Sequence, residues 1–170
     1  IAVRNSVYNY DLVSLCETNL NCSVEMPDPL LKAYKFISAN HPENLSHSGL
    51  VLFYQNTLPL KIRTDLAIRE SILVQMKFGR KKIFFTVLYT RPFFNHTSTE
   101  FQDFLVNFSN LHTKIRAETP YASFYTGDFN GHSKFWWTDG DTTPGGKEIE
   151  ERSFALNLSQ ADKFHPRQKT

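Results

Sequence analysis

Residues 121–132 read YASFYTGDFNGH, and this stretch decides how the rest of the chain is interpreted. A run of β-forming residues ends at Gly127, and two short side chains with oxygen atoms, Asp128 and Asn130, follow at once. Glycine permits a sharp backbone bend that would project both side chains to one side. Asp, Asn and Gly are also ordinary turn formers. By itself the stretch therefore leaves two interpretations open: a plain turn, or a strand end that carries chemistry.

Length and composition indicate one folded domain. The 170 residues suit a single domain with a sizeable core, and hydrophobic residues make up 41% of them. The formal net charge of +2 neither requires nor excludes a polyanionic partner, so any case for DNA binding must come from local features. Cys16 and Cys22 form no zinc pattern and no disulfide framework, which favours a reducing compartment.

The sequence also bears on localisation. No stretch approaches the roughly 18 apolar residues of a membrane span, and the first residues lack a signal-peptide pattern, so an intracellular protein is expected. One observation keeps a secreted protein open as the lesser alternative. Asn-X-Ser/Thr sequons occur at Asn21, Asn44, Asn95, Asn107 and Asn157.

Strands are predicted wherever β-branched, aromatic and apolar residues gather. The predicted ranges are 10–17, 34–38, 49–54, 71–78, 82–90 and 121–129. Gly79-Arg80-Lys81 joins the fourth range to the fifth, which predicts an antiparallel hairpin.

One long helix is predicted over residues 97–118. Apolar residues recur there at three- and four-residue spacing, Thr97 with Glu100 forms a capping-box pattern, and Thr119-Pro120 ends the helix. A second helix is expected after Thr143-Pro144, running to about residue 157, and a short one near residues 29–35. This order favours mixed sheets with helices packed outside them.

Polar residues end three of the apolar strands. Glu17 follows LVSLC, Tyr89 follows IFFTVL, and Asp128 and Asn130 follow ASFYTG. Carboxylates such as Glu17 and Asp128 suit Mg²⁺ or the orientation of a water molecule. Each residue also has a plain alternative, since Glu17 could cap the following loop and Tyr89 could be a half-buried amphipathic residue. Their shared position at strand ends favours chemistry.

Five segments, in this order, make the sequence recognisable: DLVSLCETNLN, HSGLVLFY, KKIFFTVLYTRP, YTGDFNGHSKFWWTDGDTTPGGKEIEE and LNLSQ. Together they resemble the endonuclease domain of LINE-type (non-LTR) retrotransposons, within the endonuclease/exonuclease/phosphatase superfamily of DNase I. The resemblance implies an α/β fold, the DNase I-like four-layered α/β sandwich, over residues 1–170. It also implies hydrolysis of a DNA phosphodiester with Mg²⁺, or Mn²⁺ in its place, leaving a 3′-hydroxyl that primes reverse transcription.

The resemblance also implies a role for single residues. Glu17 would hold the metal, Tyr89 would hydrogen-bond the scissile phosphate, Asp128 would orient or activate the attacking water, and Asn130 would bind a phosphate oxygen. Arg91, Trp136 and Trp137 are candidates for DNA contact, with packing as the alternative for the two tryptophans. The implied partners are DNA and a reverse-transcriptase domain of the same polyprotein, with action in the nucleus and no membrane.

The chain departs from that family at both ends. The first strand with its Asn, and the final strands with their Asp and Ser-Asp-His segment, are absent, so we expect a domain truncated at both ends and inactive as an isolated fragment. His165 does not match the missing histidine. Whether the chain is an enzyme thus stays open. The alternatives are a catalytically dead relic or binding module of the same fold, a secreted DNase-like enzyme, and a phosphatase acting on phospholipids or nucleotides.

One basic cluster has no place in this scheme. Lys77, Arg80, Lys81 and Lys82 surround the predicted hairpin turn. They could track nucleic-acid phosphates, or they could be a solvated hairpin tip.

Overall fold

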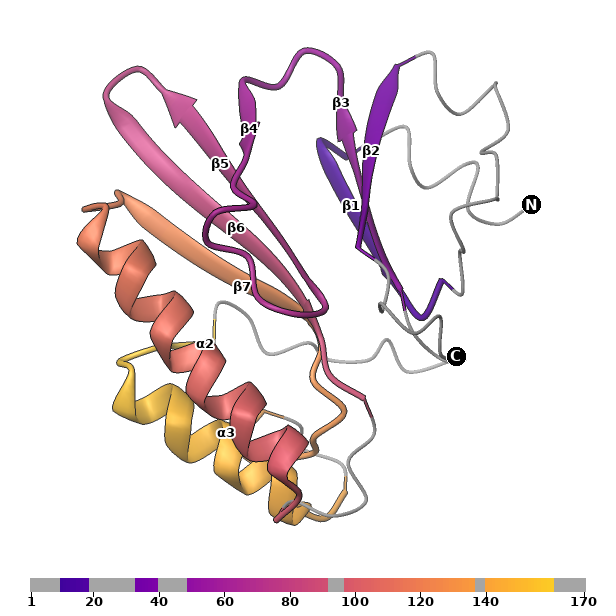
Figure 1. Ribbon diagram of the computed structural model, residues 1–170, viewed down its shortest axis with the longest axis vertical. Helices are drawn as coiled ribbons and strands as arrows, with labels where there is room; N and C mark the ends of the chain where they lie inside the picture. The colour runs from indigo at the N-terminus through magenta and orange to yellow at the C-terminus, as the bar shows by residue number, and fades with distance from the viewer. Residues whose placement is uncertain (1–9, 19–32, 40–48, 92–96, 137–139, 161–170) are drawn as a thin grey trace, which may run out of the picture.

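Three layers make up the described part of the chain, which in this computed structural model comprises residues 10–18, 33–39, 49–91, 97–136 and 140–160. Figure 1 shows them side by side: a three-stranded sheet, a four-stranded sheet and a pair of helices. The α/β class predicted from the sequence is confirmed. Of the four layers in the predicted sandwich, the described residues form three.

Sheet A contains β1 (Leu12–Cys16), β2 (Tyr34–Ala39) and β3 (Leu50–Gln55), in the order β1-β3-β2. All its neighbours are antiparallel, and β3 is the central strand. The three strands lie where the sequence predicts them. The short helix expected near residues 29–35 is wrong at its end, because Tyr34 and Lys35 open β2; residues 29–32 lie outside the described ranges.

Sheet B contains β4 (Leu60–Ile62), β5 (Ser71–Phe78), β6 (Lys81–Tyr89) and β7 (Ala122–Asp128), in that order. The predicted β5–β6 hairpin is confirmed, with Gly79 and Arg80 between the strands and Gly79 at a φ of 60°. β4 was not predicted, since three residues are too few to show a period. β7 runs parallel to β6, which requires the long crossover that the helix between them supplies.

Two helices cover the outer face of sheet B. α2 spans Thr99–Ala117 and α3 spans Pro144–Ala155, close to the predicted ranges. The cap of α2 is Ser98, one residue beyond the predicted Thr97, and its Oγ accepts from the Phe101 N–H at 3.3 Å. Thr143 caps α3 as its position before Pro144 suggests.

Sheet B is buried on both faces, which explains the unbroken apolar run at its centre. Towards sheet A, Ile72, Val74, Val87 and Tyr89 pack against Leu50 and Leu52 of β3. Towards α2, Leu73 and Phe84 pack against Leu111 and Ile115. The two cores hold the ends of β6 and β7 in fixed positions, and the candidate site lies at these ends.

Candidate active site at the strand ends

The polar residues predicted at three strand ends come together in the structure. Tyr89 and Asp128 end β6 and β7 and are direct partners in the parallel register. Glu17 follows β1 of the other sheet, and its Oε1 accepts a 2.8 Å hydrogen bond from the Tyr89 hydroxyl. This bond joins sheet A to sheet B at the edge where both carboxylates lie.

Tyr89 is buried yet keeps its polar tip among carboxylates. It is 1% exposed and packs into the core between the sheets. Burial raises the pKa of the Tyr89 phenol well above its usual value, and the hydrogen bond to Glu17 and the charges of Asp128 and Glu70 raise it further. The phenol therefore stays protonated at neutral pH and remains a hydrogen-bond donor.

The site gathers backbone conformations that cost energy. Glu17 has a φ of 53°, Glu70 of 53° and Asn130 of 46°, all in the left-handed region that L-residues with side chains rarely adopt. Such positions cost about 1–3 kcal/mol each and persist only where the surrounding structure imposes them. Their concentration around one set of polar side chains is typical of functional sites.

Gly127 lets β7 approach β6 closely just before Asp128. Its φ is 134°, and a Cβ at this position would lie 1.8 Å from the carbonyl oxygen of Leu88. Only glycine therefore fits here without moving one of the strands.

The turn after β7 is ordered by its own hydrogen bonds. The Asn130 N–H donates to Asp128 Oδ1 at 2.9 Å, and Asn130 Nδ2 donates to the carbonyl of Thr90 at 2.5 Å. The Thr90 N–H in turn donates to the Asp128 carbonyl at 2.9 Å. An amide has two N–H donors, so the Asn130 side chain keeps one for another acceptor.

The N-terminal end of α3 holds the next residues of the same loop. The His132 N–H donates to Thr143 Oγ1 at 3.1 Å, and the Thr143 N–H donates to the His132 carbonyl at 2.8 Å. Ser133 donates to Glu150, and a Cβ on Gly146 would lie 2.0 Å from the His132 carbonyl oxygen. The GDFNGH stretch is thus fixed from both sides, by β6 and by α3.

Arg91 lies beside Glu70 and lines a cavity next to the Glu17–Tyr89 pair. Its Nε lies 3.7 Å from Glu70 Oε1, and both residues line a cavity of about 170 Å³ with Glu100 and Asp103 of α2. Three buried atoms here make no hydrogen bond within the described residues: Nε and Nη2 of Arg91, and Oε1 of Glu70. Whether Arg91 contacts phosphate stays a prediction.

Trp136 lies within the described residues, shortly after the GDFNGH stretch. Trp136 is partly buried against Phe101, Leu105 and Ile149, which agrees with the packing alternative. A DNA contact by Trp136 stays a prediction. Trp137 and His165 lie outside the described residues.

Sequence reasoning missed two residues of this region, Thr90 and Glu70. Thr90 is 2% exposed and links the ends of β6 and β7. Glu70 accepts from the Tyr89 N–H through its backbone carbonyl at 3.0 Å. Glu70 precedes β5 as Glu17 follows β1, but a polar residue before a strand is common and indicates little by itself.

The carboxylates at the site suit a hard cation that takes only one or two of its ligands from the protein. Within the described ranges no group of three or more His, Cys, Asp or Glu side chains could enclose a metal. Mg²⁺ commonly takes one or two carboxylates and fills its other positions with water and substrate phosphate. Glu17, an exposed carboxylate beside Tyr89, fits that requirement; the nearby Cys16 does not, because burial raises the pKa of its thiol.

Comparison with solved structures shows the same fold elsewhere. The endonuclease domain of TRAS1, a telomere-specific non-LTR retrotransposon, superposes with a TM-score of 0.66 at 12% identity, over 91% of this chain and 62% of that one. The human Nocturnin catalytic domain with bound sulfate anion superposes with a TM-score of 0.51 at 19% identity, over 91% and 60%. The chain thus has a DNase I-like fold, as the sequence resemblance implied, and spans less than two thirds of either structure.

Two further comparisons found no match: no family model matches the sequence, and the search of curated proteins found none similar to it. No helix in the described part of the chain is both long and apolar enough to cross a membrane.

Proposed function

We propose that this chain carries the hydrolytic site of a metal-dependent DNA endonuclease of the retroelement type, which nicks one strand to leave a 3′-hydroxyl. The observation that carries the proposal is the 2.8 Å hydrogen bond between Tyr89 and Glu17, with Asp128 as the register partner of Tyr89. A carboxylate for a cation, a neutral phenol and a second carboxylate at one edge are what phosphodiester hydrolysis requires.

Each side chain has one role in the proposed reaction. Glu17 would hold Mg²⁺, with Mn²⁺ as a substitute. The Tyr89 hydroxyl has one proton, which it donates to Glu17 in this structure, and it would turn that proton to a phosphate oxygen once Glu17 holds the cation. The remaining Asn130 N–H would donate to a phosphate oxygen as well. A cation bound by Glu17 would supply positive charge to offset the negative charge that develops on the phosphate. The high pKa of Tyr89 keeps its proton available for donation throughout the neutral range.

Asp128 acts on the nucleophile. A water molecule aligned by its carboxylate attacks phosphorus, the bond between phosphorus and the 3′ oxygen breaks, and the 5′-phosphate stays on the other fragment. The proton that the water loses passes to the carboxylate of Asp128, and the leaving oxygen takes a proton from solvent. The fixed turn from Asp128 to His132 holds this carboxylate in one orientation, which general-base catalysis requires.

Plasmid nicking tests the proposal. A chain extended through the Asp and Ser-Asp-His segment of the family should convert supercoiled DNA to open circles with Mg²⁺, and Asp128→Ala in that chain should reduce the rate at least about 100-fold. Asp141→Asn, which removes an exposed carboxylate paired with Lys134, is the control and should nick normally. Undiminished nicking by the Asp128 variant would contradict the assignment.

Metal binding gives a second, independent measurement. Glu17→Gln should weaken Mg²⁺ or Mn²⁺ binding measured by calorimetry, whereas Asp141→Asn should not. Equal affinities in the two variants would remove Glu17 from the metal site.

A binding module of the same fold is the second candidate. The family places a histidine at the hydrolytic site for proton transfer, but His112, the buried histidine of the described residues, lies against the Tyr125 hydroxyl on the α2 side of sheet B. A protein that binds DNA but does not nick it, with or without the Asp128 change, would favour this candidate. Association with a reverse transcriptase and action in the nucleus belong to the first candidate.

A further inference from the structure

A basic hollow lies at the hairpin end of sheet B, away from the candidate active site. It encloses about 490 Å³ and is lined by Lys61, Arg63, Lys77, Lys82 and a single carboxylate, Glu118. β6 runs from this end to Tyr89, and the seven residue-to-residue steps from Lys82 to Tyr89 separate the two places by about 23 Å. In Figure 1 the β5–β6 turn and the last turn of α2 lie at the opposite end of the sheet from the strand ends of β6 and β7.

The strand register places these lysines on one face. Lys61 is the partner of Gln75, and Lys77 is the partner of Lys82. Gln75 and Lys77 are two residues apart on β5, so their side chains point to the same side of the sheet. This is the side covered by α2 further along, where Leu73 packs against Leu111.

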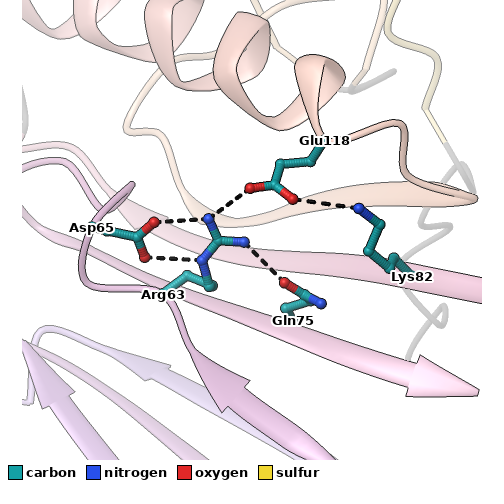
Figure 2. A network of polar contacts seen from close by, with 5 residues as sticks. All are labelled: Arg63, Asp65, Gln75, Lys82 and Glu118. Carbon is teal, nitrogen blue, oxygen red and sulfur yellow. Dashed lines mark hydrogen bonds and ion pairs between the residues drawn. The ribbon is translucent and has the colours of Figure 1, made fainter.

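The acidic groups at this end are already matched by a buried arginine, as Figure 2 shows. Arg63, 6% exposed, donates from Nε and Nη2 to the two oxygens of Asp65 at 2.9 and 2.7 Å, and from Nη1 to Gln75 at 2.9 Å. Its Nη2 also donates to Glu118 at 2.9 Å, and the other Glu118 oxygen accepts from Lys82 at 3.4 Å. Arg63 and Lys82 together therefore offset the two carboxylates, and the charges of Lys61 and Lys77 are left in excess.

Lys61 and Lys77 form no ion pair among the described residues, although the charge of Lys61 acts on nearby Asp65. Among the described residues, no carboxylate lies within ion-pairing distance of either. Like charges directly opposite one another on neighbouring strands are destabilising, and Lys77 faces Lys82 in this way. A lysine on an edge strand discourages strand-to-strand aggregation, which is an alternative reason for Lys61 on the edge strand β4. That reason does not apply to Lys77 and Lys82, because β5 and β6 are central strands. A bound anion would offset this repulsion.

We propose that this lysine-lined hollow is a second nucleic-acid contact surface, which takes backbone phosphates of a DNA segment outside the one held at the Glu17–Tyr89 edge. The choice of nucleic acid as the anion rests on the proposed function. One exposed aromatic side chain lies at the same end of the sheet: Tyr121 is 64% exposed, with Lys81 Nζ 4.1 Å from its ring centre. A duplex that reaches both places spans at least about 7 base pairs.

The test compares two double variants that each remove two positive charges. Lys61→Gln with Lys77→Gln changes the hollow and spares Lys82, which pairs with Glu118. Lys35→Gln with Lys147→Gln changes exposed lysines on β2 and α3 and is the control. Binding of a fluorescent duplex of about 20 base pairs is measured by anisotropy in EDTA over a series of salt concentrations.

The hollow variant should bind about tenfold more weakly than the parent protein, and its slope of log affinity against log salt should fall by about 2, since each lost phosphate contact contributes about 0.9. The control should change neither quantity beyond a small general effect. Affinity and slope equal to those of the control, or a parent protein that does not bind duplex, would overturn the proposal. So would unchanged duplex binding together with loss of binding to polyglutamate, which would assign the surface to an acidic protein.

The result separates this proposal from the function proposed above. Normal nicking with unchanged binding by the hollow variant would overturn the second contact surface and leave the nuclease in place. Binding that depends on Lys61 and Lys77 in a protein that never nicks DNA would uphold the surface and contradict the nuclease.

Discussion

The hydroxyl of Tyr89 donates a 2.8 Å hydrogen bond to the carboxylate of Glu17 across 72 residues of sequence. Glu17 belongs to the end of β1 in sheet A and Tyr89 to the end of β6 in sheet B, so the bond forms only when the two sheets pack. The relative positions of Glu17 and Tyr89 in the candidate site therefore depend on the core between the two sheets.

Tyr89→Phe should lower the free energy of unfolding by about 1 kcal/mol at neutral pH, because one partly buried hydrogen bond is lost while the exposed Glu17 carboxylate can bind water instead. Chemical denaturation of both proteins measures this. Because the folded protein raises the pKa of Tyr89, its contribution is complete below pH about 10 and is lost as the pH rises beyond that. The difference between parent and variant should therefore narrow above pH 10, and a difference that widens there would contradict the assigned environment.

Gly127→Ala should destabilise the protein by at least about 3 kcal/mol, because an unfavourable φ is combined with overlap between the new Cβ and the Leu88 carbonyl. Gly140→Ala is a matched control, since Gly140 has a similar φ of 129° but nothing within 4 Å of an added Cβ. The control should cost only about 1–2 kcal/mol, the strain alone. Equal losses in thermal or chemical denaturation would mean that the β6–β7 approach is looser than described.

His112 should titrate below its usual range. It is buried between α2 and β7 with its Nδ1 2.9 Å from the Tyr125 hydroxyl, and burial lowers the pKa of His112, with a smaller contribution from the charge of Arg116. A depressed pKa means that the unfolded chain binds the proton first, so this contribution to stability is present above pH about 6.5 and is lost as the pH falls below it. A histidine titration followed by nuclear magnetic resonance should place His112 below 6.5. A value above 6.5 would contradict the buried environment.

The same pair provides a second measurement at high pH. Burial raises the pKa of Tyr125 to about 12, so its absorbance change should come well after that of an exposed tyrosine. Tyr125→Phe should reduce the late change in absorbance but not abolish it, because the pKa of Tyr89 is raised as well. A late change of unaltered size would show that Tyr125 does not contribute to it.

Local periodicity accounts for the parts of the fold that sequence reasoning predicted. The long helix can be predicted because Phe101, Leu105 and Leu111 recur on one face over many turns. The central strands β5 and β6 can be predicted because they are apolar on both faces. β4 was missed because its three residues form no period, and the cap of α2 was misplaced because Thr97 and Ser98 are both good capping residues.

The sequence by itself determined which residues end the strands: Glu17, Tyr89, Asp128 and Asn130 follow apolar runs, and the pattern of the runs sets where each ends. Only the tertiary structure decided which of these ends meet. The Tyr89–Glu17 bond depends on two sheets packing face to face, and the Arg63 network joins residues 63, 65, 75, 82 and 118 that share no local pattern. The physical reason is that periodicity reports which face of an element is buried, whereas the choice of partner depends on shape and charge matched between elements far apart in the chain.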